Sequence, residues 1–241
     1  ELDEKYGPHR FYLFHREREW APSENCWMGW ERKRGKLEDL NRLLNGEPPR
    51  EGINIVRYGD PDRLRSIRYV ITLDRDTQMP RGTARRMVET MAHPLNTPRI
   101  DEVRGIVTGG YAIIQPRIST SLPSATATPF SKLFTDPVGS DPYTTAVSDV
   151  YQDLSGEGSY HGKGIYDPRA FYEVLKGRFP EARLLSHDLV EGTYARVGLA
   201  SDIELFDDFP GDYASYSVRE HRWICGDWQI ARWILPRVLS G

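Results

Sequence analysis

Two aspartates directly follow a short apolar run near residue 70. The run Tyr69–Leu73 has the composition of a buried strand, and Asp74 and Asp76 come next. Successive strand residues point to opposite faces, so carboxylates two positions apart can aim the same way. Ligands of open α/β sheets bind at the carboxyl ends of strands, and paired carboxylates suit Mg²⁺ or Mn²⁺ holding a diphosphate. The pair predicts a divalent-cation site; the alternative is a turn in which Thr77 caps the next helix.

A second acidic cluster lies more than a hundred residues further on. It consists of Ser186, His187 and Asp188, with Glu191 one helical turn later. In the first turn of a helix, the macrodipole alone explains Asp188, so a functional role needs a partner from elsewhere in the chain. The cluster is not a hydrolase triad, because sequence neighbours seldom meet with triad geometry and the chain has no Gly-x-Ser-x-Gly elbow.

Glycine is dense between residues 156 and 164. The segment has His161 where a dinucleotide fingerprint needs its third glycine, and Lys163 is followed by Gly164 where a Walker loop needs Ser or Thr. Neither phosphate motif is therefore present. The turn still allows close backbone approach of a sugar or a phosphate.

A basic run occupies residues 31–36, at the start of an expected helix. A turn of this kind can contact a diphosphate. The alternative is a solvated charge cluster, which is the common outcome for such runs.

Apolar runs of strand length alternate with helical patterns, which indicates an α/β fold. The length allows one large domain or two small ones, and a single domain over residues 1–241 is favoured because these patterns resume after residue 129 without a new start. The expected strands are 11–14, 53–56, 69–73, 111–115 and 200–206. The expected helices are 37–44, stopping at Gly46; 84–92, ending before Pro94; 167–175, with Asp167 as N-cap; and 186–197, finishing at Gly198.

Two further segments stand out by composition. Ser, Thr, Pro and Ala dominate residues 119–129 and predict a long loop over 116–142, either over a site or as a domain linker. Residues 214–238 combine tryptophans with arginines and predict an amphipathic C-terminal helical segment. This segment is either interfacial or a core helix with snorkelling arginines.

Composition excludes several classes of protein. The 241 residues carry 32 Lys+Arg against 35 Asp+Glu, so the chain lacks the basic surface that nucleic acid requires. No apolar run approaches the ~20 residues needed to span a bilayer, and the segment is expected to be soluble. Cys26 and Cys225 are far apart and without zinc-finger spacing, so neither a disulfide framework nor a structural zinc site is implied.

Taken in order, these motifs resemble the glycosyltransferase domain of bacterial cyclic β-1,2-glucan synthases (glycosyltransferase family 84). That domain is itself similar to processive family-2 transferases such as cellulose synthase. The matching stretches are residues 11–16, 27–36, 72–78, 147–153, 156–167, 185–189, 221–224 and 226–229. The resemblance implies a GT-A-like, Rossmann-like fold with a mixed central sheet. It also implies a nucleobase-binding strand before residue 11, and none is seen in the sequence, so we expect a fragment.

The resemblance implies a role for individual residues. Asp76 would bind the metal, and Asp74 would lie nearer the nucleotide and also face the metal. Asp188 would be the catalytic base, although Ser186 and His187 precede it where the family has Thr-Glu. Further implied contacts are Lys33, Lys36 and Arg222 to the donor, and Trp223, Gly162, Lys163 and Trp30 to the acceptor. Arg219 stands where the family has Gln, which leaves its role open.

The implied activity is inverting, Mg²⁺- or Mn²⁺-dependent transfer of glucose from UDP-glucose to a growing β-1,2-glucan. The intact protein would lie at the cytoplasmic face of the bacterial inner membrane, attached through segments absent from this chain. The piece alone is expected to bind UDP-glucose weakly or not at all. The alternatives are a non-catalytic carbohydrate-binding or scaffold fragment, and a glycoside hydrolase using Asp76 and Asp188.

Overall fold

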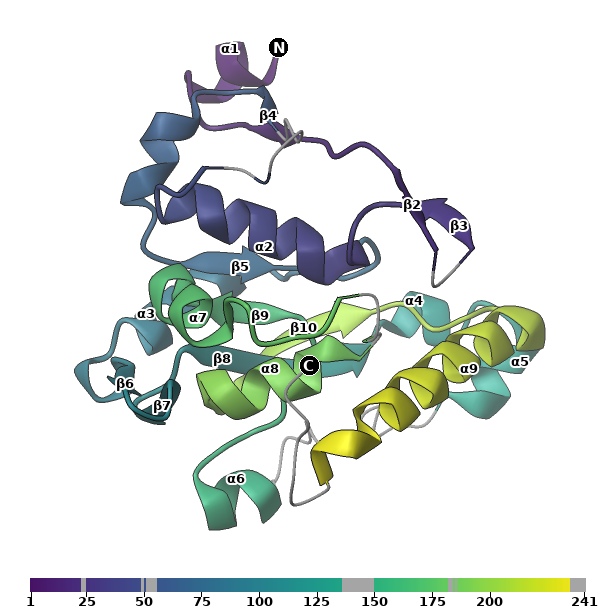
Figure 1. The fold of residues 1–241 in the computed structure, drawn as a ribbon. Coiled ribbons are helices and arrows are strands. Elements are labelled where there is room, and N and C mark those ends of the chain that lie inside the picture. The colour runs from purple at the N-terminus through teal and green to yellow at the C-terminus, as the bar shows by residue number, and fades with distance from the viewer. Residues whose placement is uncertain are drawn as a thin grey trace. The chain divides into compact units, whose positions relative to one another are not determined.

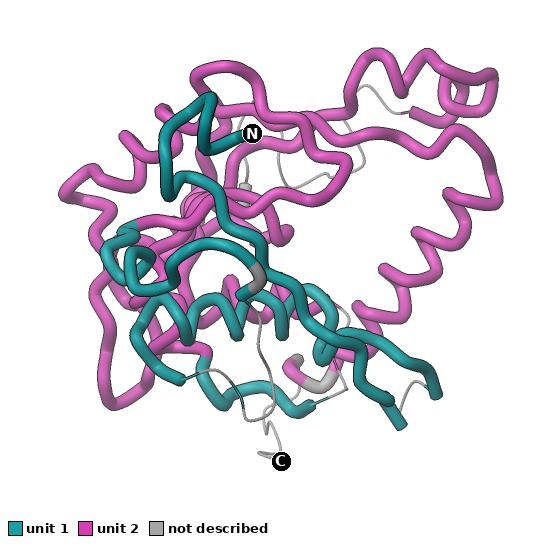
Figure 2. Tube along the Cα trace, turned by 90° about the horizontal axis from the view of Figure 1, so that it is seen from above, with its two compact units in different colours: residues 1–68, 176–182 teal, residues 69–175, 183–241 magenta. Residues whose placement is uncertain are grey.

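The computed structural model describes residues 1–22, 25–48, 50, 56–135, 150–181, 184 and 186–234. The chain forms two compact units, shown in different colours in Figure 2. Unit 1 comprises residues 1–68 and 176–182, and unit 2 comprises residues 69–175 and 183–241. The single domain expected over residues 1–241 stays a prediction, and each unit is described by itself.

Unit 1 is built around one helix. Its elements are α1 (Leu2–Tyr6), β1 (Leu13–Phe14), β2 (Glu19–Ala21), β3 (Cys26–Met28), α2 (Arg32–Leu44), β4 (Val56–Tyr58) and the 3₁₀ helix η1 (Pro61–Ser66). β1 pairs antiparallel with β4, and β2 with β3. α2 packs against η1 and buries Leu37 and Leu44. It ends near Gly46, whose φ of 76° fits the predicted stop. The expected strand at 11–14 is reduced to two residues, and 53–55 lie outside the described residues.

Unit 2 contains a mixed four-stranded sheet (Figure 1). The strands are ordered β10 (Val197–Asp207), β8 (Ile113–Thr120), β9 (Gly164–Tyr166) and β5 (Val70–Thr72). β8 and β10 are parallel, while β9 runs antiparallel to both β8 and β5. β5 is therefore parallel to β8 and β10. It follows that the carboxyl ends of these three strands lie at the same edge as the amino end of β9.

The core of unit 2 lies between this sheet and α3 (Thr83–Met91). α3 contacts β8, β9 and β10. It contributes Met87 and Met91, one turn apart, and it ends before Pro94 as the sequence predicts. The sheet residues buried with them are Ile114, Ile165, Ala200 and Ile203.

Two helices after β9 position the second acidic cluster. α7 (Pro168–Leu175) begins as predicted, because the Asp167 carboxylate accepts hydrogen bonds from the backbone N–H groups of Arg169 and Ala170. α7 packs against α8 (His187–Ala195). The sequence predicts that this second helix extends to residue 197. It ends earlier because Arg196 has a φ of 52° and β10 begins at Val197.

The segment that predicts a long loop is largely ordered secondary structure. β8 runs to Thr120, and α4 (Leu122–Ala125) and α5 (Pro129–Phe134) follow. The Ser, Thr and Pro residues serve as helix caps, because Ser121 and Thr128 accept hydrogen bonds from backbone N–H groups three positions on. The loop prediction is therefore wrong for 116–135, and 136–142 lie outside the described residues.

The remaining elements of unit 2 are mostly short. They are the 3₁₀ helix η2 (Pro94–Asn96), the antiparallel pair β6 (Arg99–Asp101) and β7 (Ile106–Gly109), α6 (Val150–Ser155), α9 (Tyr213–Ile230) and the 3₁₀ helix η3 (Ala231–Ile234). The predicted helical segment 214–238 is thus helical over its described part. Among the helices that the structure describes, none combines the length and the apolar character needed to cross a bilayer.

Candidate active site

Three strand ends of unit 2 are joined by one lysine. Asp74 follows β5, Lys163 precedes β9, and Asp207 ends β10. Lys163 Nζ lies 3.3 Å from Asp74 Oδ2 and forms a second ion pair with Asp207 Oδ2. The lysine side chain is only 14% exposed. The expected acceptor contact at Lys163 is therefore a largely buried ammonium that holds two carboxylates at the edge of the sheet.

The two carboxylates stabilise the protonated form of Lys163. Burial acts to lower its pKa, but the carboxylates of Asp207 and Asp74 outweigh burial and leave the pKa above its ordinary value of 10.5. The stabilisation from these ion pairs is fully present below pH 10.5. It is lost as pH rises through the higher folded-state pKa.

Replacing Lys163 with methionine is expected to lower the free energy of unfolding at pH 7 by about 2 kcal/mol, because two partly buried carboxylates lose their counter-ion. Urea unfolding of both proteins measures the difference, which should shrink as pH rises from 10.5, where the lysine of the unfolded chain deprotonates, through the higher folded-state pKa. Lys132→Met, at an exposed lysine on α5, is the matched control. Equal unfolding midpoints for wild type and Lys163→Met would contradict a stabilising role of the two Lys163 ion pairs.

The turn after β5 is hydrogen-bonded to β10. The backbone N–H of Asp74 donates to Thr77 Oγ1 at 3.2 Å, and Thr77 Oγ1 donates to Asp207 Oδ1 at 2.7 Å. Gln78 exchanges two backbone hydrogen bonds with Phe206. Thr77 therefore does not cap a helix: α3 begins only at Thr83, with Gly82 as its N-cap residue. Asp76 lies exposed on this turn, while Asp74 is half-buried.

Asp188 reaches the same edge of the sheet through Gly162. A Cβ built on Gly162 would lie 2.8 Å from both carboxylate oxygens of Asp188, so this carboxylate packs directly against the glycine backbone. Gly162 has a φ of 76° and immediately precedes the lysine that binds Asp74. Asp74 and Asp188, more than a hundred positions apart in the sequence, thus contact adjacent residues of one turn, Lys163 and Gly162.

The neighbours of Asp188 on α8 are also polar and buried. His187 Nδ1 lies 3.3 Å from Asp188 Oδ1 and 3.1 Å from Glu191 Oε1. Burial, and then the charges of Asp188 and Glu191, raise the pKa of the Tyr160 phenol, whose oxygen lies 3.4 Å from Thr72 Oγ1. The His187 imidazole thus lies between the carboxylates of Asp188 and Glu191, and Asp188 in turn packs against Gly162.

His187, Asp188 and Glu191 also have the chemistry of metal ligands. One donor atom from each falls within 4.8 Å of the others, and over the described ranges no other group of three His, Cys or acidic residues does so. Imidazole nitrogen and carboxylate oxygen suit Zn²⁺ or Mn²⁺. Asp74 and Asp76, the predicted metal ligands, do not belong to such a group. His187 and Glu191 can thus either position the Asp188 side chain or bind a metal ion together with it.

Helix α9 supplies the aromatic and basic residues. A Cβ on Gly226 would lie 2.0 Å from Ser186 Oγ, so α9 is seated on the residue that precedes α8. The Arg219 guanidinium carbon lies 4.7 Å from the centroid of the Trp223 ring. Arg222, predicted to contact the donor, is exposed, and Trp223 keeps 39% of its surface exposed.

The other predicted contacts belong to unit 1. Lys36 is exposed and Lys33 half-buried on α2. The Trp30 ring is covered on one face by the guanidinium of Arg50, which lies 3.7 Å from its centroid. Their roles as donor and acceptor contacts stay predictions.

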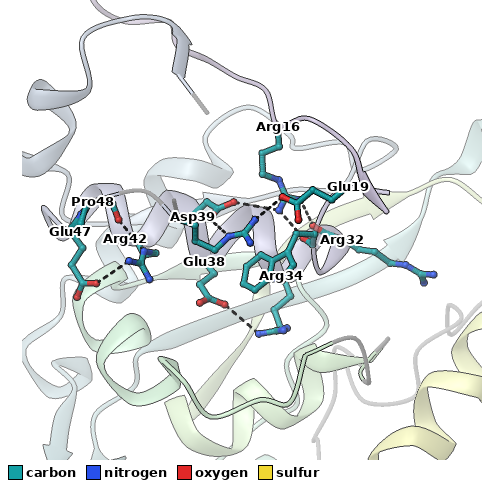
Figure 3. Close-up of polar contacts among 11 residues, drawn as sticks. Arg16, Glu19, Arg32, Arg34, Glu38, Asp39, Arg42, Glu47 and Pro48 are labelled. Carbon is teal, nitrogen blue, oxygen red and sulfur yellow. Dashed lines mark hydrogen bonds and ion pairs between the residues drawn. The ribbon is translucent and has the colours of Figure 1, made fainter. Parts of the chain in front are cut away.

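The basic run that contains these lysines takes part in an ion-pair network of unit 1. Figure 3 shows Arg34 paired with Glu38 and Arg16 with Asp39. Asp39 is 1% exposed and also pairs with Arg50. Arg34 pairs in addition with Glu31 at 2.7 Å. Part of the run is therefore structural, because Arg34 is buried in ion pairs and is not solvated as the charge-cluster alternative expects.

Sequence reasoning overlooked the acidic end of β10. Asp207 binds Thr77 and Lys163, and Asp208 accepts hydrogen bonds from Gln78 and Ser121. The signal was available, because Asp207 and Asp208 follow a predicted strand just as Asp74 and Asp76 do.

No protein-family model matches the chain. A search of curated proteins does find a relative, the cyclic β-(1,2)-glucan synthase NdvB of Rhizobium meliloti (strain 1021), with 46% identity over 232 residues. The chain is homologous to a segment of NdvB. The match covers 95% of this chain and 8% of NdvB. The unmatched remainder of this chain is shorter than either unit, so the match includes residues of both units.

Proposed function

We propose that this chain is the glycosyltransferase part of a cyclic β-1,2-glucan synthase, with a GT-A-like fold in unit 2. The observation that carries the proposal is the contact between Asp188 and Gly162, next to the Lys163–Asp74 ion pair. Homology to a segment of NdvB supports the glucan as product. The sheet edge at which these groups meet is where α/β proteins bind ligands.

The donor would be UDP-glucose, held with Mg²⁺ or Mn²⁺ at Asp76. Asp76 fits this role, since its carboxylate is exposed. Asp74 is held through Oδ2 by the Lys163 ammonium, so its proposed contribution to the cation is secondary to that of Asp76. One or two carboxylates plus substrate phosphates are the usual ligands of Mg²⁺. When bound, the cation would neutralise the charge that develops on the departing nucleotide.

Asp188 would act on the acceptor. A carboxylate beside the donor sugar can take the proton from the attacking glucan hydroxyl as the new bond forms. A single in-line displacement inverts the anomeric centre, so an α-linked donor yields a β-linked product. The exposed part of the Trp223 ring offers an apolar face for a glucose residue of the acceptor. Gly162, which has no side chain, would let the acceptor glucan approach the protein backbone closely. Arg222 is the further donor contact proposed in unit 2, while the contacts expected of Lys33, Lys36 and Trp30 in unit 1 stay sequence predictions.

Nucleotide binding tests the proposal. In the intact protein, titration calorimetry should show binding of UDP that requires Mn²⁺, and Asp76→Asn should weaken it at least tenfold, since a metal ligand is lost. Asp202→Asn removes an exposed aspartate that pairs with Arg86 and is the matched control. Binding of β-1,2-glucan oligosaccharides with no response to UDP would instead favour a carbohydrate-binding scaffold. Shortening of the glucan without nucleotide would favour a hydrolase.

A further inference from the structure

Arg219, on the second turn of α9, lies in a cage of aromatic rings. Its guanidinium carbon is 4.7 Å from the ring centroid of Trp223, 5.3 Å from that of Phe209 and 5.7 Å from that of Tyr216. Rings at these distances attract a cation and fix the plane of a guanidinium. The position of the charge is therefore set by packing rather than by an acidic partner.

Two donors of this guanidinium are unsatisfied. Nε and Nη2 are buried, and neither bonds to any residue in the described part of the chain. Buried polar groups without partners are rare, because water is lost and nothing replaces it. Nε–H and Nη2–H point in parallel from one edge of the guanidinium, and this edge is the fork that grips two oxygens of a carboxylate or phosphate.

The fork lies within the electrostatic reach of the sheet edge described above. Burial lowers the pKa of Arg219, and the charges of Glu220 and Tyr216, followed by those of Asp76 and Asp207, partly offset that effect. These carboxylates are close enough to be felt but do not fill the fork. Helix α9, which carries Arg219, is also seated on Ser186, two residues before Asp188.

We propose that Arg219 binds the diphosphate of the nucleotide donor through Nε and Nη2. This inference rests on the proposed function, and it assigns a role to the one position of the α9 motif that resemblance left open. Exposed Arg222 has no comparable pair of buried donors. Sequence reasoning favoured Arg222 for the phosphate, whereas the aromatic cage and the empty fork single out Arg219.

Substitution by lysine tests this role, because lysine keeps the charge but cannot form the fork. In the intact protein with Mn²⁺, Arg219→Lys should weaken UDP binding about tenfold or more and leave uridine binding unchanged. Arg86→Lys, at an exposed arginine of unit 2, is the matched control. Inorganic pyrophosphate should compete with UDP in the wild type and compete less well in Arg219→Lys. The pyrophosphate competition in the wild-type protein does not depend on whether the variant folds.

The outcomes separate the two proposals. UDP binding that is unchanged in Arg219→Lys would overturn the role of Arg219 and leave the proposed function standing. Equal weakening of uridine and UDP would also overturn it, because the arginine would then act on the fold or on the nucleoside. If the wild-type protein bound neither UDP nor pyrophosphate, both proposals would fall together.

Discussion

Asp188→Asn in the intact protein is expected to lower the rate of glucan synthesis by a factor of about 10²–10⁴, which is the usual contribution of a general base. Asparagine keeps the shape of the side chain beside Gly162 but cannot accept the proton of the acceptor hydroxyl. UDP affinity and the thermal midpoint should change little. Transfer of labelled glucose from UDP-glucose gives the rate, and Asp202→Asn serves again as the control on an exposed carboxylate.

The same variant distinguishes a base from a metal ligand. His187, Asp188 and Glu191 form a set that could hold an ion. If Asp188 is the base, the metal content of the purified protein stays the same in Asp188→Asn while synthesis falls. A parallel loss of bound metal and of activity would assign Asp188 to metal binding. Synthesis at the wild-type rate would remove Asp188 from the mechanism.

Gly162→Ala should be nearly as damaging, although it adds only a methyl group. The new Cβ would lie 2.8 Å from both oxygens of Asp188, so the carboxylate must move. Displacing a reacting group by about 1 Å can cost about 10²-fold in rate. We therefore expect synthesis to fall about a hundredfold, with UDP binding largely retained. The same radiolabel assay and calorimetry measure both quantities.

Gly82→Ala controls for the backbone term of that substitution. Gly82 has a φ of 87°, close to the 76° of Gly162, but nothing lies within 4 Å of its Cβ position. Both alanines should therefore cost roughly 1–2 kcal/mol of stability from left-handed backbone strain. Only Gly162→Ala should lower the rate. Equal losses of activity in the two variants would mean that strain, and not the contact with Asp188, is responsible.

The elements with a strong periodic pattern could be predicted from sequence. Met87 and Met91 recur at helical spacing and form α3, and the apolar run before Asp74 forms β5. By contrast, β9 has three residues and begins with a glycine, so it has no periodicity of its own. It is a strand because β5 and β8 pair with it on either side, which is a long-range property.

The candidate site shows the same division. Local patterns pointed to Asp74, Asp76 and Asp188, but no spacing along the chain could reveal that Lys163 joins β5 to β10. That ion pair depends on the antiparallel placement of β9 between parallel strands. The role of Arg219 was equally hidden, because its cage combines two residues of α9 with Phe209 from the preceding loop.

The seat of α9 on α8 has a mechanical consequence. Gly226 leaves no room for even a methyl group above Ser186, and Ser186 is two residues before Asp188. We therefore expect a tilt of the helix that carries Trp223 to shift the start of the helix that carries Asp188. Binding of an acceptor glucose on the Trp223 ring would then also affect the orientation of the Asp188 carboxylate. An acceptor end that packs poorly on the ring would misplace the carboxylate.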